Sequence, residues 1–309
     1  MSRQRSLRDF REALASAQAL LEDRAAAPPA AAALPAPPLP SLLAQARDLL
    51  DGAGARPAPL RCLQHLACTG GTLISRCIAA LPNVRVLSET DPLSEIGRAA
   101  TRFTPDNMVG LARFGSRPPT REGLIEIFLG GLEVLRRDCR RHGLDLVIRG
   151  HGHSQFHTRA IAEDRPTVPE ILAGAGPLHT VVTVRHPLDS YLALQTNAWL
   201  HFTPSTIDEY ARRYHAFLDR HAELPQMRYE DFVADPETRM QWLCARLELR
   251  YDPGFRERLA MMRLSGDSGR RGDVIAPRPR RPCPEGILRQ ARESDAFGRL
   301  LDRLGYAGS

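Results

Sequence analysis

Residues 60–81 read LRCLQHLACTGGTLISRCIAAL and largely decide the expected fold. Leu60–Ala67 is an apolar-rich run whose length suits one buried strand. Cys68–Thr72 follows as a glycine turn. From near Thr72 onward, apolar residues recur with the 3.6-residue period of a helix. The stretch therefore predicts a strand, a tight turn and a helix in immediate succession.

A strand, a glycine turn and a helix together form a geometry that binds phosphate. Gly70 and Gly71 let the backbone approach a ligand closely, and the free N–H groups at the helix N-terminus face an anion. Thr69 and Thr72 are expected to add hydroxyl donors. A Walker loop is excluded, because its G-x-x-x-x-G-K-[ST] pattern requires a Lys.

The rest of the chain predicts an α/β protein with a parallel sheet flanked by helices. Further strand-like runs follow at residues 84–89, 144–149, 179–185 and 226–229, separated by helical segments, and this alternation is typical of right-handed parallel crossovers. Ligands of such sheets bind beyond the carboxyl ends of the strands. Glu89, His151 and Arg185 stand at those ends, so we expect them on one rim with Cys68–Thr72.

The composition is that of an ordinary globular protein with an excess of positive charge. The 309 residues carry a net charge of +6, and all 42 basic residues are Arg. Fixed positive contacts to an anion must therefore come from guanidinium groups, which suit phosphate and sulfate. No basic patch interleaved with aromatic residues is present, so nucleic-acid binding is not expected.

Two regions differ in composition. Residues 1–58 predict an N-terminal helical segment with an Ala/Pro linker, and residues 59–309 predict the main domain. The N-terminal helices are a candidate surface for homo-oligomer formation. With no membrane span and no signal peptide in the sequence, a cytoplasmic protein is expected. The six cysteines lack C-x-x-C spacing, so neither a zinc ribbon nor a redox pair is indicated.

Four segments resemble the PAPS-dependent sulfotransferases, a family with a P-loop nucleotide-hydrolase-like fold. Residues 68–74 resemble the 5′-phosphosulfate loop K/R-S-G-T-T-x-x, with Cys68 in place of the basic residue. Residues 185–193 resemble the 3′-phosphate segment R-x-P-x-D-x-x-x-S, with Ala193 in place of Ser, and Ser190 is a candidate substitute. Residues 227–236 match R-Y-E-D-L-x-x-D-P, and residues 264–272 resemble the flexible loop over the 3′-phosphate.

The resemblance implies that PAPS is the sulfuryl donor, that no metal is needed, and that the donor is held by a defined set of residues. These are Cys68, Thr69, Gly70, Gly71, Thr72, Leu73, Arg185, Ser190, Tyr229, Arg270, Arg271 and Gly272.

Two residues compete as the base that activates the acceptor. Glu89 stands where the tyrosylprotein branch of the family has its catalytic Glu, after the loop helix and a P-x-V-R turn. His151, in the segment Ile148–His151, resembles the catalytic His of the cytosolic branch. The closer match favours Glu89, with His151 as co-base or orienting residue, and Arg149 is expected to help carry the sulfate charge.

Two other functions compete with a sulfotransferase. His151, His153 and His157 could form the metal cluster of a hydrolase. Alternatively, the departures at Cys68 and Ala193 suit a degenerate protein that binds PAP or another nucleotide without turnover. The acceptor is expected to be a small molecule or a glycan, lipid or peptide, and the sequence does not identify which.

Overall fold

The computed structural model describes residues 58–94, 107–159, 161, 164–264 and 274–306, together with the isolated positions 15 and 19. The chain divides into two compact units, residues 1–56 and residues 57–309. The predicted N-terminal helices, the Ala/Pro linker and three predicted donor-binding residues lie outside the described residues. Those three are Arg270, Arg271 and Gly272.

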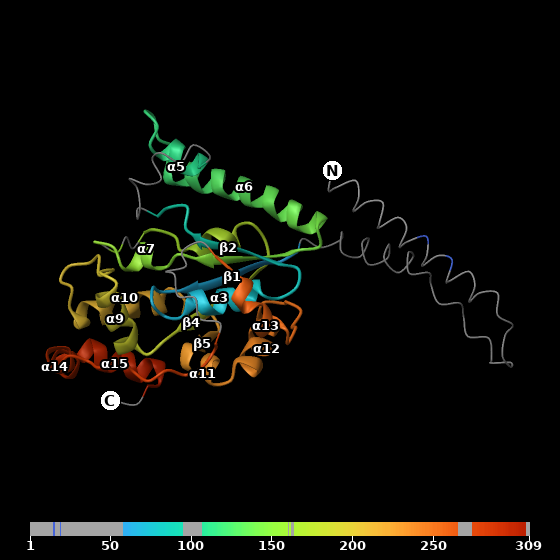
Figure 1. Cartoon of the computed structure of the whole chain (residues 1–309). Coiled ribbons are helices and arrows are strands. Elements are labelled where there is room, and N and C mark those ends of the chain that lie inside the picture. Colours follow the sequence, from blue (N-terminus) through green and yellow to red (C-terminus); the bar gives the residue numbers. More distant parts are fainter. Residues whose placement is uncertain are drawn as a thin grey trace, which may run out of the picture. The chain divides into compact units, whose positions relative to one another are not determined.

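A parallel sheet of five strands forms the centre of the second unit, in the order β2-β3-β1-β4-β5 (Figure 1). All four neighbouring pairs are parallel. The α/β class predicted from the sequence is therefore confirmed. The strands lie close to the predicted runs, at β1 Leu60–His65, β2 Val84–Thr90, β3 Asp145–Gly150, β4 Leu178–Val184 and β5 Gln226–Arg228.

Helices connect and cover the strands. Those before β4 are α3 Gly71–Ala79, α5 Met108–Arg113, α6 Arg121–Arg141, α7 His153–Phe156 and α8 Val168–Ala173. Those after it are α9 Pro187–Thr196, α10 Ile207–Asp219, α11 Tyr229–Ala234, α12 Pro236–Arg246, α13 Phe255–Arg258 with the 3-10 turn η1 Leu259–Met261, α14 Glu285–Glu293 and α15 Asp295–Leu304.

The central strand β1 is buried along its whole length and contributes side chains to the core on both faces of the sheet. Leu63 packs in a cluster with Ile74 of α3 and Leu243 of α12. Cys62 packs in a second cluster with Leu132 of α6. Alternate residues of a strand point to opposite faces. An apolar-rich run in place of strict alternation is therefore what a strand covered by helices on both sides requires.

The C-terminal helical region is divided into two helices, α14 and α15. Ser294 interrupts it in an extended conformation and caps α15, its hydroxyl accepting a hydrogen bond from the amide of Phe297. The same hydroxyl donates to the carboxylate of Asp208 at 2.7 Å. A serine with two such partners favours a new N-terminus over an unbroken helix.

Within the described ranges, no helix combines the length and the apolar character that crossing a membrane would require.

Replacement of Leu63 by Ala tests the packing of the central strand. Leu63 is fully buried, so Leu63→Ala is expected to lower the free energy of unfolding by about 2–5 kcal/mol through lost burial and a residual cavity. Val134→Ala on α6 is the control, because Val134 is 57% exposed and its loss should change stability by less than about 0.5 kcal/mol. Urea denaturation measures both, and equal effects would contradict the packing described.

Candidate active site

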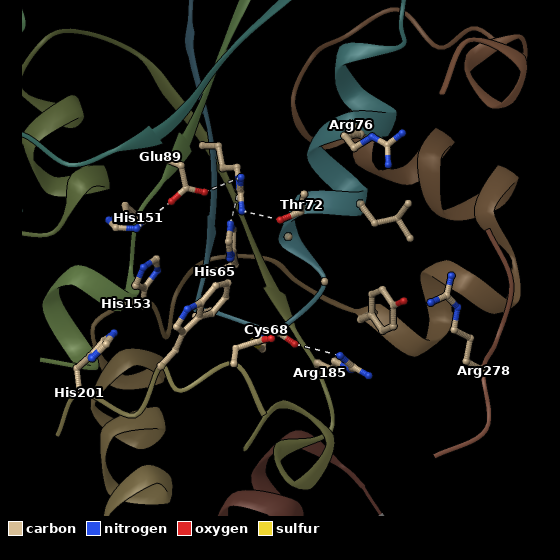
Figure 2. A pocket seen from close by; sticks show the side chains of 18 of the residues that line it. His65, Cys68, Thr72, Arg76, Glu89, His151, His153, Arg185, His201 and Arg278 are labelled. Atoms are coloured by element: carbon tan, nitrogen blue, oxygen red, sulfur yellow. Dashed lines mark hydrogen bonds and ion pairs between the residues drawn. The ribbon is translucent and has the colours of Figure 1, made fainter. Parts of the chain in front are cut away.

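A pocket of about 390 Å³ opens beyond the carboxyl ends of β1, β2, β3 and β4 (Figure 2). It gathers most of the residues that the sequence singled out, although they come from separate parts of the chain. Those that line it are Cys68, Gly70, Gly71, Thr72, Leu73, Glu89, Arg149, His151, Arg185 and Tyr229.

The turn between β1 and α3 requires glycine for steric reasons. Gly70 has φ +87°, and a Cβ added there would lie 2.1 Å from a ring carbon of Tyr229. A Cβ added to Gly71 would lie 2.3 Å from the ring of His65. The backbone is therefore pressed between two aromatic side chains, and any larger residue would displace it.

The start of α3 is free to bind an anion. Gly70 occupies the N-cap position, and among the described residues no side chain caps the helix. The amides of the first turn therefore lack the usual capping acceptor, and the positive end of the helix dipole faces the pocket.

One of the two threonine side chains of the turn lies at the pocket, as expected, and the other does not. Thr72 lines the pocket. Thr69 is fully buried, and its hydroxyl donates to the carbonyl of Leu66 at 2.7 Å. The structure therefore does not place the Thr69 hydroxyl at the pocket, because that hydroxyl closes the turn instead.

Arg149, near the end of β3, is buried, with 4% of its side chain exposed. It joins the glycine turn to the ends of β2 and β1 through every nitrogen of its guanidinium group. Its contacts are to the carboxylate of Glu89 at 2.6 Å, the hydroxyl of Ser88 at 2.9 Å, the hydroxyl of Thr72 at 3.0 Å and Nε2 of His65 at 2.8 Å.

His65 accepts a hydrogen bond from Arg149 because its tautomer is set by the backbone. Nδ1 lies 2.8 Å from the carbonyl of Leu66 and must donate to it, which leaves Nε2 as an acceptor. Burial, together with the charge of Arg149, lowers the pKa of His65 to about 3. The ring is therefore neutral at physiological pH and orients the guanidinium without adding charge.

Glu89 is turned toward the pocket by an irregular backbone. The pairing of β2 with β3 shifts between Leu87 and Thr90, and Glu89 has φ +58°, a left-handed conformation that is uncommon outside glycine. Burial by itself raises the pKa of the Glu89 carboxyl. The hydrogen bond from His151 and the charge of Arg149 outweigh that effect, so the pKa lies below its ordinary value.

Two histidines follow β3 beside Glu89. Nε2 of His151 lies 2.8 Å from Oε2 of Glu89, and the ring of His153 stands edge-on to that of His151 with centroids 3.6 Å apart. Burial, followed by the neighbouring His151, holds the pKa of His153 far below its usual range. His153 is thus a neutral imidazole at physiological pH.

The third histidine of the expected metal cluster lies elsewhere. His157 is buried in the protein core and packs against the rings of Phe202 and Tyr210, with centroids 5.7 and 5.6 Å away. It does not line the pocket. A cluster of His151, His153 and His157 is therefore not formed.

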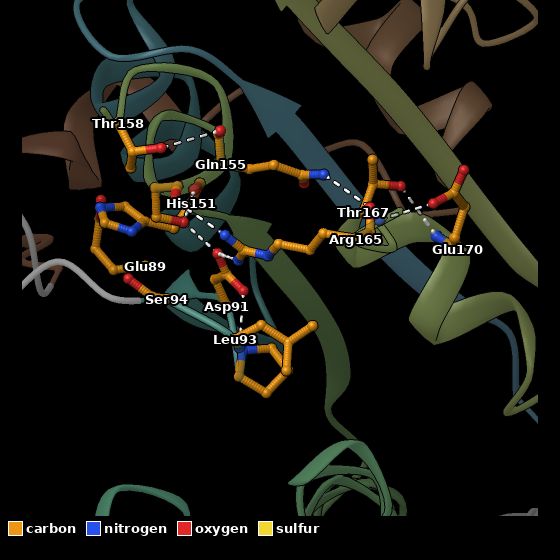
Figure 3. Close-up of polar contacts among 12 residues, drawn as sticks. Glu89, Asp91, Leu93, Ser94, His151, Gln155, Thr158, Arg165, Thr167 and Glu170 are labelled. Atoms are coloured by element: carbon orange, nitrogen blue, oxygen red, sulfur yellow. Dashed lines mark hydrogen bonds and ion pairs between the residues drawn. The ribbon is translucent and has the colours of Figure 1, made fainter. Parts of the chain in front are cut away.

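The side chain of Asp91 braces the segments that carry Glu89 and His151 (Figure 3). It is 4% exposed, pairs with Arg165 and accepts from the hydroxyl of Ser154. Its other oxygen accepts from the amide of Leu93 at 2.9 Å. The Ser154 hydroxyl also contacts the carbonyl of His151 at 2.6 Å. These contacts tie the end of β2 to the loop after β3.

Arg185 forms the opposite wall. Its Nη1 donates to the carbonyl of Cys68 at 3.1 Å, and its guanidinium lies 4.9 Å from the ring centroid of Tyr229. Its Nε is buried and has no hydrogen-bond partner among the described residues. An unsatisfied guanidinium N–H at a pocket wall is typical of a site that receives an anion.

Ser190, the expected substitute for the serine missing at Ala193, does not line the pocket. It is fully buried, and its hydroxyl lies 2.6 Å from that of Tyr210 while also contacting backbone carbonyls of the first turn of α9. The structure therefore does not bring the Ser190 side chain to the pocket.

Several lining residues were not singled out from the sequence as site residues. His65 lies within an apolar run, and Arg76 lies on α3, where it also contacts the carbonyls of Leu259 and Met262. A partly exposed wall comes from residues after α9 and from the C-terminal stretch that follows the predicted covering loop. It consists of Asn197, Trp199, His201, Val274, Ala276 and Arg278.

Removal of the Asp91 carboxylate tests the brace. Asp91→Ala leaves the guanidinium of Arg165, whose side chain is 11% exposed, without its charge partner. The free energy of unfolding should therefore fall by about 3–5 kcal/mol. Asp164→Ala is the control, because Asp164 and its partner Arg121 have 75% and 39% of their side chains exposed and such pairs contribute at most about 1 kcal/mol. Chemical denaturation compares them, and similar losses would refute the brace.

No curated protein sequence matches the chain significantly. Solved structures similar to it include the following three. The sulfotransferase domain of the olefin synthase from Synechococcus PCC 7002 has 18% identity and a TM-score of 0.45, covering 82% of this chain and 97% of that one. Mouse sulfotransferase SULT7A1 complexed with PAP has 10% identity and a TM-score of 0.35, covering 81% and 84%. Retinol dehydratase in complex with androsterone and inactive cofactor PAP has 14% identity and a TM-score of 0.36, covering 78% of this chain and 80% of that one.

The sequence model described as "Sulfotransferase family" matches residues 66–253. This match spans more than half of the chain and runs from the glycine turn through α12, so it includes Glu89, Arg149, His151, Arg185 and Tyr229. The protein belongs to the sulfotransferase family.

Proposed function

We propose that this protein transfers the sulfuryl group of PAPS to a hydroxyl or amine of an acceptor. The observation that carries the proposal is the meeting of two features in one pocket. An anion-binding glycine turn stands on one side, and the hydrogen-bonded group of Glu89, His151 and Arg149 stands on the other. Sulfuryl transfer needs both, because the donor must be held still while the acceptor loses its proton.

The pocket residues fit the phosphates of such a donor. The backbone at Gly70 and Gly71 approaches so closely that a side chain would fill the space, and the uncapped start of α3 presents amide donors. Arg185 supplies the buried Nε, and Tyr229 lies beneath its guanidinium. These residues, together with Arg76 and Arg278 on the pocket wall, would hold the anionic groups.

Proton removal is assigned to Glu89. Bound PAPS would supply the sulfuryl group, whose bond to the 5′-phosphate oxygen would break as a new bond forms between its sulfur and the acceptor's oxygen or nitrogen. Glu89 is ionised at physiological pH, since its pKa is held low, and it receives the proton that the acceptor loses. His151 orients the carboxylate through Oε2, and Arg149 keeps positive charge near the transferring group.

We also propose residence in the cytoplasm. All six cysteines are free thiols, which agrees with a reducing compartment. A homo-oligomer formed through the N-terminal helices stays a prediction, since those residues lie outside the described ranges.

Replacement of Gly71 by Ala tests the glycine turn. In Gly71→Ala the new methyl would overlap the ring of His65 and displace the turn, at a cost of about 1–3 kcal/mol, so PAP should bind about tenfold more weakly or worse. Gly131→Ala on α6 is the matched control, because an added Cβ meets nothing within 4 Å there. Calorimetric titration with PAP measures the difference, and equal affinities would contradict binding at this turn.

Replacement of Glu89 and of His151 separates the two candidate bases. Glu89→Gln should lower turnover by about 10²–10⁴-fold with PAP affinity retained, and His151→Ala should lower it less. A larger loss in His151→Ala would assign proton removal to His151 and orientation to Glu89. Near-normal rates in both variants would refute the assignment. PAP binding with no turnover by the unaltered chain over a broad acceptor panel would instead identify a degenerate binding protein.

A further inference from the structure

Glu89, His151 and His153 form a cluster on one side of the pocket that is richer in ligand atoms than proton transfer requires. Each of the three offers one ligand atom, and those atoms lie within 4.8 Å of one another. They come from two adjacent strand ends (Figure 2). Because His157 is in the core, this set differs from the histidine cluster that the sequence suggested.

We propose that Glu89, His151 and His153 bind a zinc-class divalent transition-metal ion, and that the bound ion reversibly blocks sulfuryl transfer. The second half of this proposal rests on the proposed function. Two imidazoles and one carboxylate suit Zn²⁺ and its neighbours in the first transition row, whereas Mg²⁺ and Ca²⁺ prefer a set made only of oxygen ligands.

The required movements are small. Ligand atoms about 2.0–2.1 Å from a tetrahedral Zn²⁺ lie about 3.3 Å from one another. Here Oε2 of Glu89 and Nε2 of His151 are 2.8 Å apart, and no pair of the three ligand atoms exceeds 4.8 Å. No separation therefore has to change by more than about 1.5 Å, within the reach of side-chain rotation. Solvent would complete the coordination.

The cluster is held in place by its surroundings. Oε1 of Glu89 is fixed by Arg149 at 2.6 Å, which leaves Oε2 as the oxygen that faces His151. The amide of His151 donates to the carbonyl of Thr90 at 3.0 Å. Asp91 and Ser154 tie the two strand ends together. Outer contacts of this kind orient metal ligands, although the charge of Arg149 weakens the attraction of a second cation.

His153 is the residue that distinguishes a metal site from a catalytic pair. Its Nδ1 is shielded from solvent and has no hydrogen-bond partner among the described residues. The proposed proton transfer uses Glu89 and His151 and gives His153 no task. A metal ion would occupy Oε2 of Glu89 and Nε2 of His151, and so remove the carboxylate and its orienting partner from catalysis.

Cobalt titration of the tag-free, chelator-treated full-length chain tests the site without any substrate. We expect one Co²⁺ per chain with the visible absorption of a four- or five-coordinate nitrogen and oxygen site. A thiolate-to-cobalt band should be absent, which matters because Cys68 lines the same pocket. His153→Gln should weaken binding at least about 100-fold, the upper end of what loss of an outer-shell partner costs.

His142→Gln is the matched control for surface histidines. His142 is 63% exposed and lies 3.4 Å from the carboxylate of Asp138 on α6, so it offers an ordinary histidine–carboxylate pair outside the pocket, and its loss should leave cobalt binding unchanged. Failure to bind one Co²⁺, a thiolate band, or equal affinity in His153→Gln and the unaltered protein would each overturn the site. If thermal unfolding shows that His153→Gln does not fold, Glu89→Gln takes its place with the same expected loss.

A second measurement tests the block. The assay uses PAPS and an acceptor that the protein has been found to sulfate. Zn²⁺ should inhibit the transfer, and a chelator should restore it. The His153→Gln variant should need about 100-fold more Zn²⁺ for the same inhibition. Metal binding without inhibition would overturn the regulatory role. Absence of transfer in metal-free buffer would overturn the proposed function instead, while the cobalt titration would still decide the metal site.

Discussion

The site depends on the contacts that the guanidinium of Arg149 makes. A cation buried this deeply is unstable unless its charge and its N–H donors find partners. Glu89 supplies the charge, and Ser88, Thr72 and His65 supply the remaining acceptors. The same residue therefore connects the turn after β1 with the end of β2. Arg149 thus joins into one unit the part of the pocket that we propose binds the anion and the part that we propose accepts the proton.

The backbone at Glu89 shows how that unit is maintained. A left-handed conformation at a residue other than glycine costs about 1–3 kcal/mol, and Glu89 adopts one at φ +58°. The ion pair with Arg149 and the contact with His151 offset this cost. Cys68 is also left-handed, at φ +64°, and its carbonyl is held by Arg185. Both irregular residues border the pocket, and each is held by a contact to a neighbouring side chain.

Much of this architecture could be predicted from residue patterns, because a strand that helices cover on both faces appears in the sequence as an apolar-rich run. The five strands and the glycine turn were recognisable in this way, and the strand ends placed Glu89, His151 and Arg185 near one edge. Side-chain direction was harder to predict. Thr69 and Ser190 stand in the expected segments, yet their hydroxyls turn inward to satisfy buried backbone carbonyls. His65 resembled an ordinary core position, since a polar residue inside an apolar run gives no sign of its partner 84 residues later.

The packing of His65 against Gly71 has an evolutionary consequence. The imidazole fills the space that any side chain at position 71 would need, while its Nε2 serves Arg149. A smaller residue at position 65 would admit alanine at position 71, but it would also have to retain an acceptor for the guanidinium. Homologous sequences should therefore show correlated substitution at positions 65, 71 and 149, and a lineage that loses the arginine should be released from the histidine and the glycine together.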